Sequence, residues 1–197
     1  MSDDRTLQKA EATLAELSTP NHALPLGPLA PIVEGAFSAM KKNEWIVCGS
    51  RERVGAVLRG ASPDRLIDGN AGARPYKIAP VSDAPGNRAL HAVGLALGSE
   101  APVLCILGSA SAASGAFHEA LNAAVLTDAP VTFLVATTPI TDDAPVGLQL
   151  AASPLDLAQA HGLSTSAAKP TVKDVKSAVT KARKLAKPSL IHVQLEL

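Results

Sequence analysis

Two apolar runs with a helical pattern between them dominate the distribution of hydrophobic residues along the chain. The runs cover 103–107 and 131–135, and each is too short for an independent helix, so both predict buried strands. Between them, apolar residues recur at the spacing of an amphipathic helix over 117–126. Apolar strands joined by a helix pair in parallel and are covered on both faces. The pattern therefore predicts an α/β fold, doubly wound, with a mainly parallel sheet and helices on both faces.

The remaining segments follow the same rules. Further strands are expected at 45–48 and 190–195, and Gly94 predicts the close approach of another backbone. The segment 68–83 is rich in glycine and proline and predicts a long irregular loop, and another loop is expected over 139–151. Helices are expected over 6–17, 32–40, 50–60, 62–67, 87–98, 153–162 and 172–185.

The chain divides into two expected parts. Residues 1–31 form an N-terminal helix and a proline-rich linker, and residues 32–197 form the α/β domain. A helix over 6–17 is too short to be stable alone in water, so it must dock on another surface.

Composition narrows the function classes. The chain has 18 basic and 18 acidic residues and no net charge, so neither nucleic acid nor an anionic membrane is expected as a partner. No apolar run approaches the ~18 residues of a membrane span. Cys48 and Cys105 lie in expected strands without CxxC spacing, and the first residues do not resemble a signal peptide, so we expect a cytoplasmic protein with reduced thiols.

Ligands of doubly wound sheets bind at the carboxyl ends of strands, which here are 108–115 and 136–141. The first segment precedes a helix N-terminus and so favours an anion, with Ser111 to Gly115 closest to it. It matches neither GxxxxGK[ST] nor GxGxxG, and a tight turn with Ser114 as helix cap explains it equally well. A serine hydrolase would require GxSxG, which is absent from the segment.

The histidines do not predict a metal centre. His118, Glu119 and Asn122 are close in sequence, but only His118 and Asn122 share a helix face. The other histidines lack zinc-type spacing. The residues alone therefore predict neither a metal site nor a catalytic residue.

The segment 115–122, GAFHEALN, and the Ala129-Pro130-Val131 that follows resemble the cofactor-binding region of the alpha subunit of thiamine-diphosphate-dependent 2-oxo acid dehydrogenases. The motif is specific for that family. The resemblance extends over 45–52, 80–94, 152–162 and 171–195. It implies the thiamine-diphosphate-binding fold and an oxidoreductase-like ancestry.

The alignment to this family places Gly108-Ser109-Ala110 on a Gly-Asp-Gly motif and Thr137-Thr138 on a pair of asparagines that hold magnesium. Ile140 replaces a tyrosine, and Ser114 replaces an acidic residue. Arg51 is retained where the family has an arginine that reaches the diphosphate. The resemblance thus implies a degenerate cofactor site at Arg51, Gly108, Ser109 and Thr138, without a magnesium carboxylate.

The first functional hypothesis is a pseudoenzyme that acts as an interaction or structural subunit and forms homodimer or heteromer contacts through helix 117–126. The alternative is an active alpha-type subunit that binds thiamine diphosphate and magnesium with Ser109 and Thr138 as substitute ligands. The resemblance implies that such an enzyme also needs a beta-type subunit, whose glutamate activates the cofactor, and a substrate-loop histidine beyond Leu197. A third hypothesis is that another small anion binds at Ser111 to Gly115.

Overall fold

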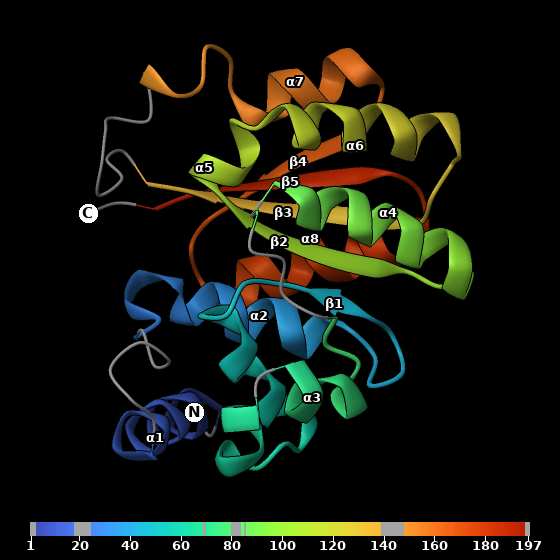
Figure 1. The fold of residues 1–197 in the computed structure, drawn as a ribbon. Helices are drawn as coiled ribbons and strands as arrows, with labels where there is room; N and C mark the ends of the chain where they lie inside the picture. Colours follow the sequence, from blue (N-terminus) through green and yellow to red (C-terminus); the bar gives the residue numbers. More distant parts are fainter. Residues whose placement is uncertain are drawn as a thin grey trace.

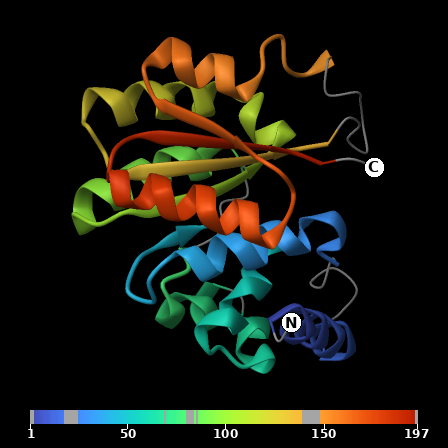
Figure 2. The ribbon, with the colours of Figure 1, turned by 180° about the vertical axis from the view of Figure 1, so that it is seen from behind.

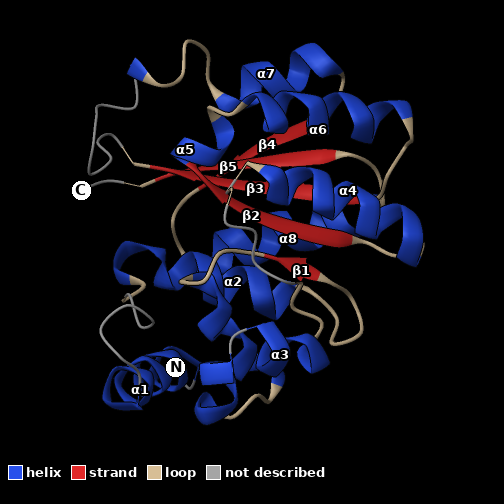
Figure 3. Cartoon of the chain, in the orientation of Figure 1, coloured by secondary structure: helices blue, strands red, loops and turns tan. Residues whose placement is uncertain are grey.

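The computed structural model describes residues 3–17, 25–68, 70–79, 84, 86–138 and 148–195. In this part of the chain a parallel sheet has the strand order β1-β2-β3-β5-β4. Figure 3 shows these strands as the centre of the molecule, with helices on either side. The strands are β1 Ile46–Val47, β2 Val103–Gly108, β3 Val131–Thr137, β4 Ser164–Ala168 and β5 Ser189–Gln194. The predicted α/β architecture is confirmed.

The helices form two layers. One face of the sheet carries α2 and α8, with α1 beyond α2, and the other face carries α4, α6 and α7 (Figures 1 and 2). The α-helices are α1 Asp3–Leu17, α2 Ala30–Ala39, α3 Asn70–Ala73, α4 Asn87–Ser99, α5 Ser109–Ala112, α6 Gly115–Leu126, α7 Pro154–His161 and α8 Val172–Leu185. The 3-10 helices are η1 Gly27–Leu29, η2 Glu52–Arg59, η3 Pro63–Asp68 and η4 Arg74–Tyr76. Among the described residues, no helix has both the length and the apolar character needed to cross a membrane.

The central strand β2 contributes to both cores. Its side chains alternate, so Leu104 and Ile106 pack with α2 and α8, whereas Cys105 and Leu107 pack with α4 and α6. Because both sets are buried, the strand reads as a continuous apolar run instead of an alternating one. The run at 103–107 therefore predicted β2 correctly.

Helix ends follow the local sequence. Ser153 and Thr171 cap α7 and α8 through hydrogen bonds from the N–H groups of Asp156 and Asp174, both at 3.1 Å. Gly162 ends α7 with a φ of 92°, a left-handed conformation that costs little without a Cβ. These helices were predicted with nearly the observed bounds.

Several expectations require correction. The segment expected as the irregular loop 68–83 contains α3 and η4, and Ile78 forms an isolated parallel bridge with Ile46. The turn at 108–115 contains the short helix α5. Part of the expected linker is helical, because η1 precedes α2 and Pro31 lies in the first turn of α2. The loop expected over 139–151 falls mostly on residues outside the described ranges.

Strand β4 was not predicted. Its sequence, Ser-Thr-Ser-Ala-Ala, has no large apolar side chain, because the strand lies at the edge of the sheet and is largely exposed. Gly94 was interpreted wrongly, since a Cβ at this position would have no neighbour within 4 Å. The division at residue 31 stays a prediction, although Leu7 and Ala10 of α1 belong to the same buried cluster as α2.

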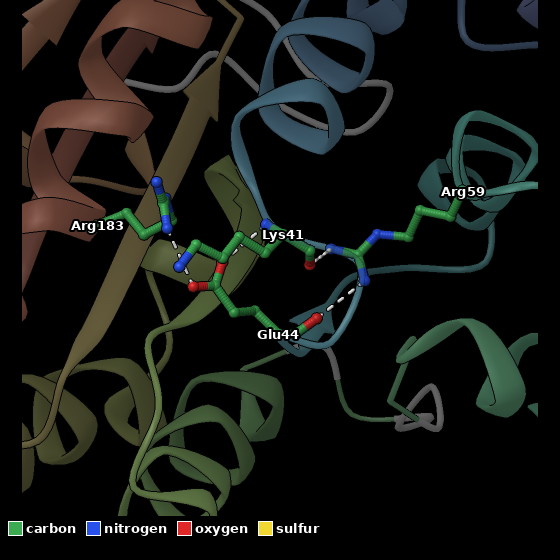
Figure 4. Close-up of polar contacts among 4 residues, drawn as sticks. All are labelled: Lys41, Glu44, Arg59 and Arg183. Carbon is green, nitrogen blue, oxygen red and sulfur yellow. Dashed lines mark hydrogen bonds and ion pairs between the residues drawn. The ribbon is translucent and has the colours of Figure 1, made fainter.

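A buried carboxylate joins distant segments at the amino end of β1 (Figure 4). Oε1 of Glu44 accepts a hydrogen bond from Nη1 of Arg183 in α8 at 3.1 Å, and Oε2 accepts one from the backbone N–H of Lys41 at 2.8 Å. Nη1 of Arg59 in η2 donates to the carbonyl oxygens of Glu44 and Tyr76. Burial lowers the pKa of Arg59 to about 10, so its guanidinium stays charged at neutral pH. These contacts fix α8, η2 and η4 to the start of the first strand.

We expect Gly35→Ala in α2 to lower the free energy of unfolding by about 1–3 kcal/mol, because overpacking forces helices apart. A Cβ at Gly35 would lie 2.7 Å from the carbonyl oxygen of Val172 and 2.9 Å from Cβ of Val175, both at the start of α8. Urea unfolding followed by circular dichroism measures the change. Gly94→Ala is the matched control and should raise stability by about 0.5–1 kcal/mol. Equal effects of the two substitutions would contradict the close packing of α2 on α8.

Candidate functional site

The predicted site residues lie at one edge of the sheet. Gly108 is the last residue of β2, Ser109 begins α5, and Thr138 follows the end of β3. Arg51 lies a few residues beyond β1, directly before η2. Because β1, β2 and β3 are neighbouring parallel strands, their carboxyl ends meet at the same edge. The structure therefore places all the predicted residues on the side where ligands bind in this type of sheet.

Hydroxyl groups dominate the end of β2. Ser109 and Ser111 are 5% and 4% exposed, whereas Gly108 is exposed. Oγ of Ser114 accepts a hydrogen bond from the N–H of Phe117 and donates one at 2.7 Å to the carbonyl of Ser111. Ser114 is thus the cap of α6, as the simpler of the two interpretations predicted. Ser114 also lies close to Gly86, the residue directly before α4. A Cβ added at Gly86 would lie only 2.0 Å from Oγ of Ser114.

Thr137 and His192 form the polar pair at the ends of β3 and β5. Oγ1 of Thr137 lies 2.7 Å from Nε2 of His192 in a hydrogen bond. The threonine is buried and the histidine half-buried, and burial lowers the pKa of His192 below its ordinary value of 6.5. The imidazole is therefore neutral at physiological pH. Sequence analysis missed His192 as part of this edge, and only the pairing of β5 with β3 brings it to Thr137.

Arg88 is a second residue that sequence analysis missed. It lies in the first turn of α4, where a positive charge is unfavourable next to the helix dipole. A basic residue at the start of a predicted helix was the one feature of the sequence that could have indicated that Arg88 contacts another part of the fold. Its Nε is buried without a hydrogen-bond partner, and a Cβ at Gly49 would lie 2.9 Å from its Nη1. The neighbouring carboxylate of Glu52 accepts a hydrogen bond from the N–H of Gly49 at 2.7 Å. The end of β1 thus carries one carboxylate close to the Arg88 guanidinium.

The thiols supply no nucleophile. Cys48 and Cys105 are free and fully buried. Burial raises the pKa of Cys105 to about 12 and raises that of Cys48 further, although Arg88 acts in the opposite direction on both thiols. Both cysteines are therefore protonated and unreactive at neutral pH, which is the structural role expected of them.

Arg51 lines a cavity with Arg53. The cavity has a volume of about 310 Å³ and lies between α1, η2 and η3, so most of its walls are apolar. Gly108, Ser109 and Thr138 do not line it. The structure therefore separates the surroundings of Arg51 from the hydroxyl groups at the ends of β2 and β3.

The described residues do not fit a magnesium diphosphate group. Magnesium prefers oxygen ligands that include a carboxylate, whereas the position after Gly108 offers the neutral hydroxyl of Ser109. The hydroxyl of Thr137 is already hydrogen-bonded to His192. Nowhere in the described ranges do three or more His, Cys, Asp or Glu side chains form a metal-binding group, and this applies also to His118 and Glu119.

The fold is shared with thiamine-diphosphate-dependent enzymes. A transketolase from Campylobacter jejuni matches with a TM-score of 0.74 at 16% identity, covering 98% of this chain and 37% of its own. A protein from Mycobacterium smegmatis assigned as a thiamin diphosphate-dependent enzyme matches with a TM-score of 0.60 at 18% identity, covering 84% of this chain and 31% of its own. Benzoylformate decarboxylase from Polynucleobacter necessarius matches with a TM-score of 0.59 at 16% identity, covering 91% of this chain and 34% of its own.

These matches define the fold and no more. The chain spans about a third of the length of each of these solved chains. No family model matches the sequence, and no curated protein matches it. The fold expected from the resemblance is confirmed, while the alpha-subunit family is not identified by these comparisons.

The neutral state of His192 predicts a pH dependence of stability. Because its pKa is lower in the folded than in the unfolded protein, the unfolded chain binds the proton more readily. The corresponding stability is fully present above about pH 6.5 and is lost as the pH falls through the folded pKa. We expect His192→Gln to reduce the loss of unfolding free energy over this window, measured by urea unfolding at a series of pH values.

Thr137→Val is the control for this experiment. It removes the hydrogen bond but keeps His192 buried, and burial is the cause of the shift. The control should therefore retain the pH dependence of the wild type. Identical pH profiles for the wild type and His192→Gln would contradict the neutral buried imidazole.

Proposed function

We propose that this chain is a pseudoenzyme related to the alpha subunit of thiamine-diphosphate-dependent 2-oxo acid dehydrogenases, and that it acts in the cytoplasm as an interaction or structural subunit. The observation that carries the proposal is the change of donor chemistry at the ends of β2 and β3. Ser109 stands at the start of α5 in place of a carboxylate, and the hydroxyl of Thr137 pairs with His192. Neutral hydroxyls compete poorly with water for magnesium.

The contact surface we propose is α6, the helix expected to mediate partner contacts. Its outer side carries Leu126, which is 77% exposed, and the adjacent helix α4 exposes Leu97 and Leu90 at 45% and 38%. Apolar side chains gathered on neighbouring helices favour burial against another protein. A second copy of this chain is the partner we test first, and a beta-type subunit is the heteromeric alternative.

The second candidate function is an active alpha-type subunit with a beta-type partner. It is favoured by the retained Arg51 and by the position of Gly108, Ser109 and Thr138 at one edge of the sheet. In that case thiamine diphosphate with magnesium would bind at this edge, and the cofactor would supply the chemistry of decarboxylation.

Titration calorimetry with thiamine diphosphate and magnesium separates the two functions. We expect no saturable heat from the wild type at millimolar cofactor. Ser109→Asp should introduce binding or strengthen it at least about tenfold, because the carboxylate supplies charge to the metal. Ser109→Asn is the matched control, because asparagine has nearly the same shape as aspartate but no charge. It should not introduce or strengthen binding. Saturable binding by the wild type would exclude the pseudoenzyme and support the active subunit.

The association surface is tested by Leu126→Asp. A charge buried in an apolar contact is strongly unfavourable, so this variant should weaken self-association at least about tenfold. Analytical ultracentrifugation over a concentration series measures the dissociation constant. Leu148→Asp, at a site 81% exposed and outside α6, should leave it unchanged. A wild type that stays monomeric at all concentrations would contradict the homodimer.

A further inference from the structure

The cavity beside Arg51 is formed by segments that are distant in sequence. Helix α1 packs across η2 and η3, and the space of about 310 Å³ lies where these elements meet. Its apolar walls include Leu14 and Ala15 from α1, Val54 from η2 and Leu66 from η3. The volume is at the lower end of the range of cavities that hold small molecules.

Two arginines provide positive charge at this cavity. Arg51 is exposed and Arg53 half-buried, and the side chain of neither makes a hydrogen bond or ion pair with any described residue. Burial lowers the pKa of Arg53, yet a guanidinium remains protonated at physiological pH.

One acidic residue, Glu11, also lines the cavity and offsets part of this charge. Oε1 of Glu11 accepts a hydrogen bond from the backbone N–H of Leu26, so the carboxylate is engaged with the chain that follows α1. Two guanidiniums that pair with no described residue, next to apolar walls, are complementary to a ligand that is anionic at one end and apolar at the other.

We propose that this cavity binds a small amphipathic carboxylate, a short-chain to medium-chain monocarboxylic acid, with its carboxylate on Arg51 and Arg53 and its apolar chain against Leu14 and Leu66. Guanidinium groups bind carboxylates through paired hydrogen bonds. Burial of the ligand's methylene groups against the apolar walls favours binding, and a diphosphate has no methylene groups to bury. The site is therefore chemically different from a cofactor site at the ends of β2 and β3.

Ligand binding would also stabilise the docking of α1. A helix of 15 residues is marginal in isolation, and Leu14 and Ala15 lie in its last turn. A molecule held between α1 and η3 binds only the docked helix, so it should shift the equilibrium towards the docked form.

The probe is decanoate, used below its critical micelle concentration and measured by titration calorimetry on the full chain. We expect saturable binding of one molecule per chain. Arg53→Gln and, separately, Arg51→Gln should each weaken it at least about tenfold, because a charge-assisted hydrogen bond is lost. Arg74→Gln, an exposed arginine of η4 outside the cavity lining, is the matched control and should leave it unchanged. Decanoate should also slow hydrogen exchange of the amides of α1.

Decanol and inorganic pyrophosphate distinguish the other outcomes. Decanol has the chain without the charge and should bind at least about tenfold more weakly than decanoate. Equal binding of decanol, equal weakening by Arg74→Gln, or no saturable binding of decanoate would overturn the proposal. Displacement of decanoate by pyrophosphate would overturn it as well and would assign the arginines to a diphosphate. None of these results depends on whether thiamine diphosphate binds.

Discussion

The parallel pairing of the strands is the constraint on which the rest of the structure depends. A parallel sheet must be covered on both faces, and each pair of adjacent parallel strands requires a crossover segment between them. Here β2, β3 and β5 are buried almost throughout, and their alternate side chains feed two separate cores. The same pairing brings the carboxyl ends of β1, β2 and β3 to one edge, so the position of the candidate site is a consequence of how the core is built.

The two edges of the sheet differ in chemistry. At the amino end of β1, Glu44 has hydrogen-bond partners for both carboxylate oxygens and its carbonyl, and the contacts with Arg183 and Arg59 join elements from both halves of the chain. A buried carboxylate is tolerated when it is satisfied in this way. At the opposite edge the side chains of Arg51 and Arg53 pair with no described residue. A buried Nε without a hydrogen-bond partner occurs at both edges, in Arg88 here and in Arg59 and Arg183 at the amino edge. The two arginines that pair with no described residue, Arg51 and Arg53, thus lie beyond the carboxyl end of β1, whereas the amino edge is an internal anchor.

Sequence patterns predicted the strands and helices whose own residues determine them. The apolar runs predicted β2 and β3, and the helical pattern of residues predicted α7 and α8, because those signals are local. Strand β4 escaped prediction because it is a largely exposed edge strand of small and polar residues, and α3 was hidden by glycine and proline that normally mark loops. The site was predicted as positions at the strand ends. The pair Thr137 and His192, the approach of Arg88 to Gly49 and the cavity under α1 depend on tertiary contacts between distant segments, which no local pattern encodes.

Arg51 links the two sites considered for this chain, and its geometry bears on both. A residue that holds a diphosphate must lie close to the hydroxyls after β2, whereas Arg51 lines a cavity in which Ser109 has no part. Arg53 shares the cavity and is half-buried, so desolvation there opposes an unpaired charge more strongly than at an exposed position. A cation in a partly desolvated site attracts an anion more strongly when water is excluded from the site. An anion with apolar surface of its own excludes that water and is favoured by the burial of its apolar surface as well. The arginines after β1 are thus better suited to an amphipathic acid than to a cofactor phosphate.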